Sequence, residues 1–233
     1  MRKALLFLTL SFSIGVLAQE QEEEGDKKKD YYENEARDRI VMSFSFDNWI
    51  YDRDNIDTLK TKWNSWGFSF CYMYDMPIGK SRFSIAPGLG FRTSWMKNNS
   101  YLFDYGDSTG FKPLDSLDYK RNSLVTSYFE IPIELRYRSR PNSKNKGFKV
   151  AIGCIGGVQM NNHTSTKADF NEDTRIVREK RWDDLARFQF GPTFRIGYGA
   201  SNVFFYYSVT NLFKQDSGPD IHPFAAGFSI NAL

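Results

Sequence analysis

Hydrophobic and polar residues alternate along most of the chain after residue 39. In the stretch FEIPIELRY, residues 129–137, apolar side chains occupy every second position, and Glu130, Glu134 and Arg136 lie between them. A period of two is that of a β-strand, whose side chains point alternately to opposite faces. Further segments show the same period, which predicts about eight strands. The eight segments are 40–47, 66–75, 82–95, 129–137, 148–159, 187–198, 203–210 and 224–231.

The two faces of these strands differ in composition. One is rich in Phe and Tyr, of which the chain has 21 and 13, and the other is rich in Gly, Ser and Arg. A soluble sheet could use this pattern once, with its polar face in water. Its repetition, in segments about as long as a tilted membrane-crossing strand, is typical of a transmembrane β-barrel. We therefore predict an all-β, antiparallel, up-and-down transmembrane barrel of about eight strands, with the polar face inward and the apolar face toward lipid.

The connections between the predicted strands alternate in length. Segments 48–65, 96–123, 160–186 and 211–221 are long, whereas 77–81, 139–147 and 199–202 are short. Outer-membrane barrels have short periplasmic turns and longer extracellular loops. The alternation predicts a bacterial outer-membrane protein with a periplasmic N-terminus and extracellular long loops.

Aromatic residues near the strand ends predict an aromatic girdle. Trp66 and Trp95 would face lipid near the outer interface, and Tyr74, Tyr137 and Tyr198 near the periplasmic interface. Girdles at both interfaces are expected for membrane barrels. The alternative is that these are ordinary strand aromatics.

Three prolines fall in the middle of predicted strands, namely Pro87, Pro132 and Pro192. Proline lacks the N–H that a strand ladder uses, and a closed barrel has no free edge to tolerate the loss. A β-bulge is one way to accommodate each proline. A bulge would also reverse the facing of the residues beyond it.

The inward phase of the strands carries many charges. An eight-stranded barrel is just wide enough inside to be filled by side chains. Because buried charges must be paired, the pattern predicts a lumenal charge network with Glu130 and Glu134 at its centre. Its predicted members are Asp75, Arg82, Arg92, Glu130, Glu134, Arg136, Lys149, Arg187 and Arg195. The basic excess leaves a narrow anion path as an alternative.

The N-terminus has the features of a secretory signal peptide. Arg2 and Lys3 precede an apolar run to Leu17, and small residues precede a cleavage site after Ala18. A membrane anchor is the alternative, although the run is short for a span. We predict a signal peptide at 1–18, a charged, disordered periplasmic leader at 19–38 and an outer-membrane barrel at 39–233.

Overall charge and cysteine content exclude several classes. The chain has 233 residues with 31 basic and 28 acidic residues, a balance that does not indicate a nucleic-acid partner. Cys71 and Cys154 fall on opposite strand phases, so we expect two free thiols. Two Cys and two His without ligand spacing predict no metal site, and no cofactor is expected.

Two weaker motifs lie in predicted loops. His163, Ser165 and nearby Glu172 are residue types that lipid A deacylases use, although the flanking residues do not match that family's motif. Ordinary loop residues are the alternative. The acidic run of Asp47, Asp52, Asp54 and Asp57 lacks the spacing of a calcium loop and is expected to be a solvated loop.

The strand FEIPIELRY, a short polar turn and then FKVAIGCIGG at 148–157 resemble the Bacteroidota outer membrane beta-barrel group, the PorT-like or "porin family" small barrels. Members of this group have a strand with the motif Ω-x-Ile-Pro-x-x-Leu, in which Ω is an aromatic or aliphatic residue. A Gly-rich strand follows it. The likeness covers roughly residues 39–233. One departure is the C-terminus, which ends in Asn231, Ala232 and Leu233 rather than in an aromatic residue.

The resemblance implies a role in an outer-membrane secretion or assembly complex. Together with the missing catalytic motif, it predicts a non-enzymatic structural or interaction component. The expected partners are outer-membrane lipid and other outer-membrane or periplasmic proteins. A small anion-preferring pore and a lipid A-modifying outer-membrane enzyme are the alternatives.

Overall fold

The computed structural model describes residues 40–52, 59–79, 81–104, 106, 109–114, 119–140, 147–170, 173–180 and 185–232. The predicted signal peptide at 1–18 and leader at 19–38 lie outside these residues. No helix in the described part of the chain is long and apolar enough to span a membrane.

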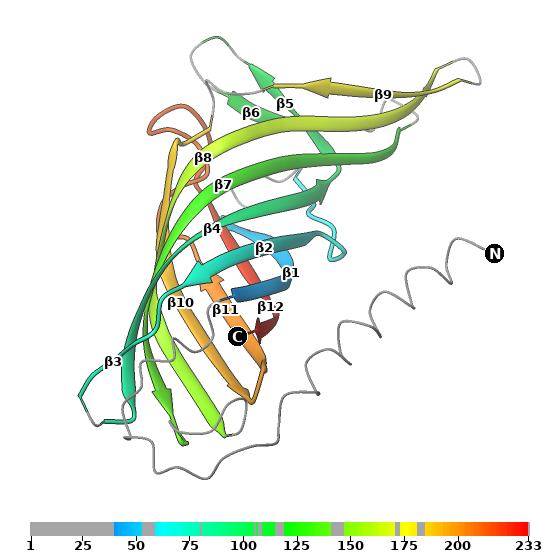
Figure 1. Ribbon diagram of the computed structural model, residues 1–233. Coiled ribbons are helices and arrows are strands. Elements are labelled where there is room, and N and C mark those ends of the chain that lie inside the picture. The colour runs from blue at the N-terminus through cyan, green and yellow to red at the C-terminus, as the bar shows by residue number, and fades with distance from the viewer. Residues whose placement is uncertain are drawn as a thin grey trace, which may run out of the picture. The chain divides into compact units, whose positions relative to one another are not determined.

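Eight antiparallel strands form a closed barrel (Figure 1), which confirms the predicted fold class. Each strand pairs with its neighbour in the chain. The pairings of β1 with β12 and of β8 with β10 complete the ring, so the barrel has no free edge. A short strand β3 (Met76–Pro77) pairs with β4. The barrel strands are β1 (Ile40–Tyr51), β2 (Trp66–Met73), β4 (Phe83–Asn98), β7 (Tyr119–Arg138), β8 (Phe148–Phe170), β10 (Phe188–Tyr198), β11 (Ser201–Tyr207) and β12 (Ile221–Ala232).

The two ends of the barrel differ in their connections. Short turns after β7 and β10 define what we call the turn end, and the opposite end, with the long connections, is the loop end. Side chains alternate in exposure along much of the barrel strands. In β1, for example, Ser43 and Ser45 are buried in the interior, while Phe44 and Phe46 are exposed. The outer surface is therefore a band of exposed aromatic and aliphatic side chains, as a lipid-facing surface requires.

None of the three prolines lies at a β-bulge. Pro132 pairs in register with Ile155, and Pro192 with Cys154, and the register of β4 with β7 is the same on both sides of Pro87. Pro132 points inward and is buried. It lies beside Gly88, where an added Cβ would come within 3.2 Å of the Pro132 ring. A glycine neighbour therefore makes room for the proline ring without a shift in register.

A register shift occurs instead near Met160 in β8. Ser127 pairs with Asn161 and Tyr128 pairs with Gln159, so Met160 is an extra residue. Met160 and Asn161 are both exposed, and the inward phase changes from odd to even positions. The alternation in the sequence is interrupted at the same place, which is why the predicted strand ends at 159.

The predicted long loops 96–123 and 160–186 are largely strand. β7 has 20 residues and β8 has 23, and both continue past the loop end of the barrel. There β8 pairs with β9 (Asp173–Glu179) instead of β10. A hairpin of β5 (Ser100–Asp104) and β6 (Thr109–Pro113) lies between β4 and β7 in sequence. We call the upper parts of β7 and β8 together with β9 the strand extension (Figure 1).

The facing of β4 can be tested by cysteine labelling. In a background lacking Cys71 and Cys154, Leu89→Cys and Phe91→Cys should react with a lipid-phase probe, because both side chains are more than half exposed on the outer surface. Ser84→Cys should stay unlabelled, because that side chain is buried in the lumen. Equal labelling of all three variants would contradict the barrel facing.

Candidate functional site

A cluster of ion pairs fills the lumen toward the turn end. Glu134 Oε2 accepts from Arg136 Nε at 2.9 Å, and its Oε1 lies 3.1 Å from Arg195 Nη2. Asp75 Oδ2 lies 2.6 Å from Arg138 Nη2, and its Oδ1 lies 3.8 Å from Arg136 Nη1. All five side chains are buried. Two carboxylates thus hold three guanidinium groups, as a buried charge cluster requires.

A second ion pair lies closer to the loop end. Asp47 Oδ1 is 3.0 Å from Arg92 Nη2, and the two side chains are 4% and 7% exposed. The hydroxyl groups of Ser45 and Ser94 donate hydrogen bonds to the same carboxylate. The guanidinium of Arg92 also lies 5.6 Å from the centre of the Tyr206 ring. The predicted charge network does not include Asp47, because the acidic run that begins with this residue is predicted to be a solvated loop.

The structure places most, but not all, of the predicted network in the lumen. Asp75, Arg92, Glu130, Glu134, Arg136 and Arg195 are buried. Lys149 is half-buried and lines a cavity with Arg136, Arg138 and Arg195. The placement of Arg82 and Arg187 in the lumen is wrong. Each precedes the first residue of its strand, β4 or β10, and is exposed.

Glu130 does not have the central role expected of it. Its side chain is 3% exposed, yet it makes no ion pair or side-chain hydrogen bond with any described residue. Arg92, which lies close enough to act on it electrostatically, is bound by Asp47 instead. Asp47 could have been found from sequence, because it continues the inward phase of Ser43 and Ser45.

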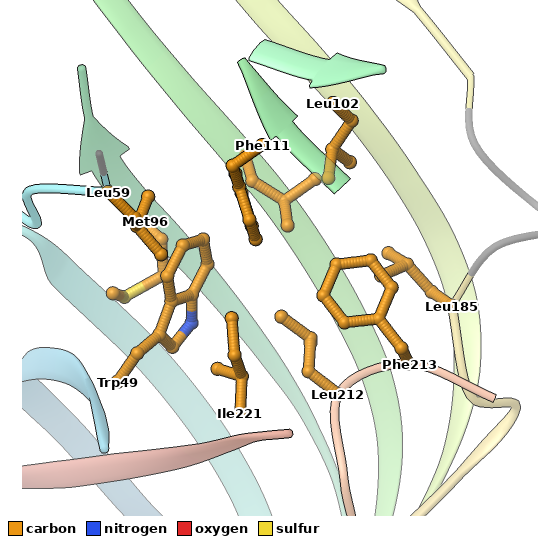
Figure 2. Packing of buried hydrophobic residues seen from close by; sticks show 10 residues of the cluster. Trp49, Leu59, Met96, Leu102, Phe111, Leu185, Leu212, Phe213 and Ile221 are labelled. Carbon is orange, nitrogen blue, oxygen red and sulfur yellow. The ribbon is translucent and has the colours of Figure 1, made fainter. Parts of the chain in front are cut away.

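Apolar side chains close the loop end of the lumen (Figure 2). Four members belong to barrel strands, namely Trp49, Met96, Leu124 and Ile221, and the others come from the β5–β6 hairpin and from connecting segments. The rings are in contact, with Phe111 centred 5.7 Å from Trp49. We call this group the outer cap. Its members are Trp49, Leu59, Met96, Leu102, Phe111, Leu124, Leu185, Leu212, Phe213 and Ile221.

Two small cavities lie among these groups. A cavity of about 20 Å³ lies between the Asp47–Arg92 pair and the outer cap, and one of about 10 Å³ lies beside Lys149. Volumes of this size hold one or a few water molecules. Ion pairs at two levels and an apolar cap at a third disfavour an anion path through the described part of the lumen.

The candidate nucleophile and base lie in a strand, not in a loop. His163 and Ser165 are half-buried in β8, on its outward side, whereas Thr164 between them is buried. The charged groups that act on His163 are Arg178 and Lys180. A general-base histidine is usually oriented by an acceptor such as a carboxylate, and these two cations cannot serve as one. The third candidate residue, Glu172, lies outside the described residues.

The two cysteines are not joined in a disulfide. Cys71 is buried, Cys154 is half-buried and both are free, as predicted. Among the described residues, no three His, Cys, Asp or Glu side chains come together in a group that could hold a metal ion.

The five predicted girdle residues all lie on the outward face of the barrel. Trp66 and Trp95 stack with ring centres 4.1 Å apart and planes inclined by 16°. They lie toward the loop end, at paired positions of β2 and β4. Tyr137 packs against Phe83 at the turn end, where Tyr74 and Tyr198 are exposed.

Sequence comparison identifies the class of protein that this fold and lipid-facing surface define. Residues 8–214 match the family model described as "Outer membrane protein beta-barrel domain", and the chain belongs to that family. It is therefore an outer-membrane β-barrel protein of the bacterial outer membrane. The match carries nothing specific to the PorT-like group. A comparison with curated proteins finds no match.

Proposed function

We propose that this barrel is a non-catalytic structural and interaction component, and a subunit of a larger outer-membrane secretion or assembly complex. In this proposal the N-terminus is periplasmic and the loop end is extracellular, as the short and long connections favour. The observation that carries the proposal is the strand extension, which presents beyond the barrel a sheet edge that no described strand covers.

That edge belongs to β9. The sheet order ends at β9, which pairs with β8 along one side only. Along its other side, no strand in the described part of the chain pairs with it. Ile176 and Val177 are both exposed, although they are neighbours and point to opposite faces. Natural proteins usually shorten, charge or cover such edges, because an exposed edge is a template for another chain.

A partner strand added to β9 would use N–H and C=O groups on the side of β9 that pairs with no described strand, as in β-strand addition. The filled lumen supports the same assignment, because it leaves the surface as the part of the barrel that can act. The resemblance to PorT-like barrels favours a secretion or assembly machine, in which other outer-membrane or periplasmic proteins are the partners.

Site-specific photocrosslinking tests this proposal. A photoreactive amino acid at Val177 should capture a partner chain in intact cells, whereas the same amino acid at Val209 should not. The two valines are matched, with 46% and 49% exposure, but Val209 lies outside the strand extension, after β11.

The same cells supply a second readout. Particles extracted in mild detergent should exceed the monomer mass and contain the captured chain in stoichiometric amount. Particles of monomer mass with no adduct at Val177, or equal adducts at both valines, would overturn the proposal.

A further inference from the structure

Basic residues gather on the outward face of the strand extension. Residues directly opposite each other in an antiparallel pair project from the same face. Trp95 of β4 is opposite Val125, which is opposite His163. His163 therefore shares a face with the girdle residue Trp95, and Val125 between them is buried. This face continues the outward face of the barrel.

The next two rows of the ladder extend this face. Ser123 is opposite Ser165, and Ser165 is opposite Arg178. One row further, Arg121 is opposite Lys167. Lys180, one residue after β9, continues that strand beside His163, on which its charge acts. We call this group the basic patch; it consists of Arg121, His163, Lys167, Arg178 and Lys180.

The strand register places the residues of the basic patch around the side chain of Ser165. Ser165 lies between His163 and Lys167 along β8 and next to Arg178 across the ladder. Direct and diagonal neighbours in a sheet have Cβ atoms within roughly 5–8 Å. A single anion above Ser165 is thus within reach of several long basic side chains.

The charges of the patch are not neutralised within the described chain. Arg121, Arg178 and Lys180 are exposed and Lys167 is half-buried, and none makes an ion pair or a side-chain hydrogen bond with a described residue. Glu179 lies between two of these cations in sequence, but it pairs with Thr164 and so projects from the opposite face.

Such an arrangement is unfavourable without an external anion. Arg121 and Lys167 are like charges directly opposite each other, a pairing that destabilises a sheet. Arg178 and Lys180 both act on His163 as well. A phosphate group would replace this repulsion between cations with attraction, because Arg and Lys bind phosphate oxygens through short, charge-assisted hydrogen bonds.

The position of the patch selects the source of that phosphate. The stacked Trp66–Trp95 pair marks the interface between lipid tails and headgroups, where tryptophan is enriched. The patch begins in the same row as Trp95 and extends away from the barrel. With the loop end extracellular, as proposed above, it is level with the headgroups of the outer leaflet. We propose that the basic patch binds a phosphorylated headgroup of an outer-leaflet glycolipid.

Native mass spectrometry of the full barrel can test this site. The protein would be released from micelles containing lipid A with its phosphates, or lipid A from which the phosphates have been removed. The phosphorylated lipid should stay bound. The double variant Lys167→Gln with Arg178→Gln should bind it at least about tenfold more weakly, since it removes two charged donors to the phosphate oxygens.

A matched double variant controls for the change in charge. Arg187→Gln with Lys214→Gln removes two exposed basic residues outside the patch and should bind the lipid like the wild type. Both variants should keep the heat-resistant gel mobility of a folded barrel. Equal binding by the patch variant, equal binding of dephosphorylated lipid A, or full competition by inorganic phosphate would overturn the proposal. None of these outcomes depends on a partner protein, so the proposed complex is tested separately.

Discussion

Replacing Asp47 with alanine should lower the free energy of unfolding of the barrel by about 3–5 kcal/mol, because it leaves Arg92 as a buried charge without its partner. The carboxylate lies 3.0 Å from the guanidinium, and both side chains are almost fully buried. Asp47→Ala also removes the acceptor for the hydroxyl groups of Ser45 and Ser94. Unfolding in urea, followed by the loss of heat-resistant gel mobility, measures the effect.

Two controls make this result specific. Glu130→Gln should be much milder, because the Glu130 side chain is buried nearby but makes no ion pair in the described chain. The double variant Asp47→Ala with Arg92→Met should recover part of the loss, since it removes the orphaned charge. If Asp47→Ala were no more harmful than Glu130→Gln, the assignment of the Arg92 partner would be wrong.

The sequence was sufficient to predict the barrel, for a physical reason. Lipid on the outside and charges on the inside force apolar and polar residues to alternate along every membrane-crossing strand. A segment outside the membrane is not forced into this period. Phe44, Leu89 and Ile133, for example, are exposed to the outside because they occupy the apolar phase. The prediction fails where that constraint ends.

The strand extension was missed because it lies beyond the stretch that needs an apolar face. The extra residue at Met160 changes the phase of β8, and the segment that follows carries polar residues on both faces. Periodicity therefore shows no strand in 160–186, although backbone pairing with β7 and β9 forms one. Polar residues on both faces are common to loops and to solvated strands.

The sequence predicts many of the charged residues that lie in the lumen, but not which of them form ion pairs with each other. The inward phase correctly places Glu134, Arg136 and Arg195 in the lumen. Which carboxylate binds which guanidinium depends on the relative stagger of strands far apart in the chain, such as β1 and β4 for Asp47 and Arg92. No local pattern contains that information. Arg82 and Arg187 fail for a simpler reason, since each lies one residue before its strand begins.

The distribution of charge suggests two separate tasks for the basic excess of this barrel. In the lumen, guanidinium groups are matched by carboxylates and fill the interior. In the basic patch, the cations make no ion pair with a described residue. Buried cations of the first kind maintain the fold, whereas exposed cations of the second kind are available to a ligand. Substitutions of the lumenal cations should therefore lower the stability of the barrel. Substitutions of the exposed cations should lower ligand binding instead.

Glu134 offers the second large effect on stability. Its side chain is only 1% exposed and bridges Arg136 and Arg195, at 2.9 and 3.1 Å. Glu134→Gln keeps the shape but removes the charge, so Asp75 would remain as the one carboxylate in a cluster of three arginines. We expect a loss of about 3–5 kcal/mol in unfolding free energy.

Arg82→Gln is the matched control, because Arg82 is exposed at the turn end and its charge is already solvated. It should change the unfolding free energy by less than about 1 kcal/mol. Added salt should leave the Glu134→Gln effect almost unchanged, since buried charges are poorly screened. A Glu134→Gln barrel as stable as the Arg82→Gln barrel would mean that the cluster toward the turn end is solvated and does not hold the lumen together.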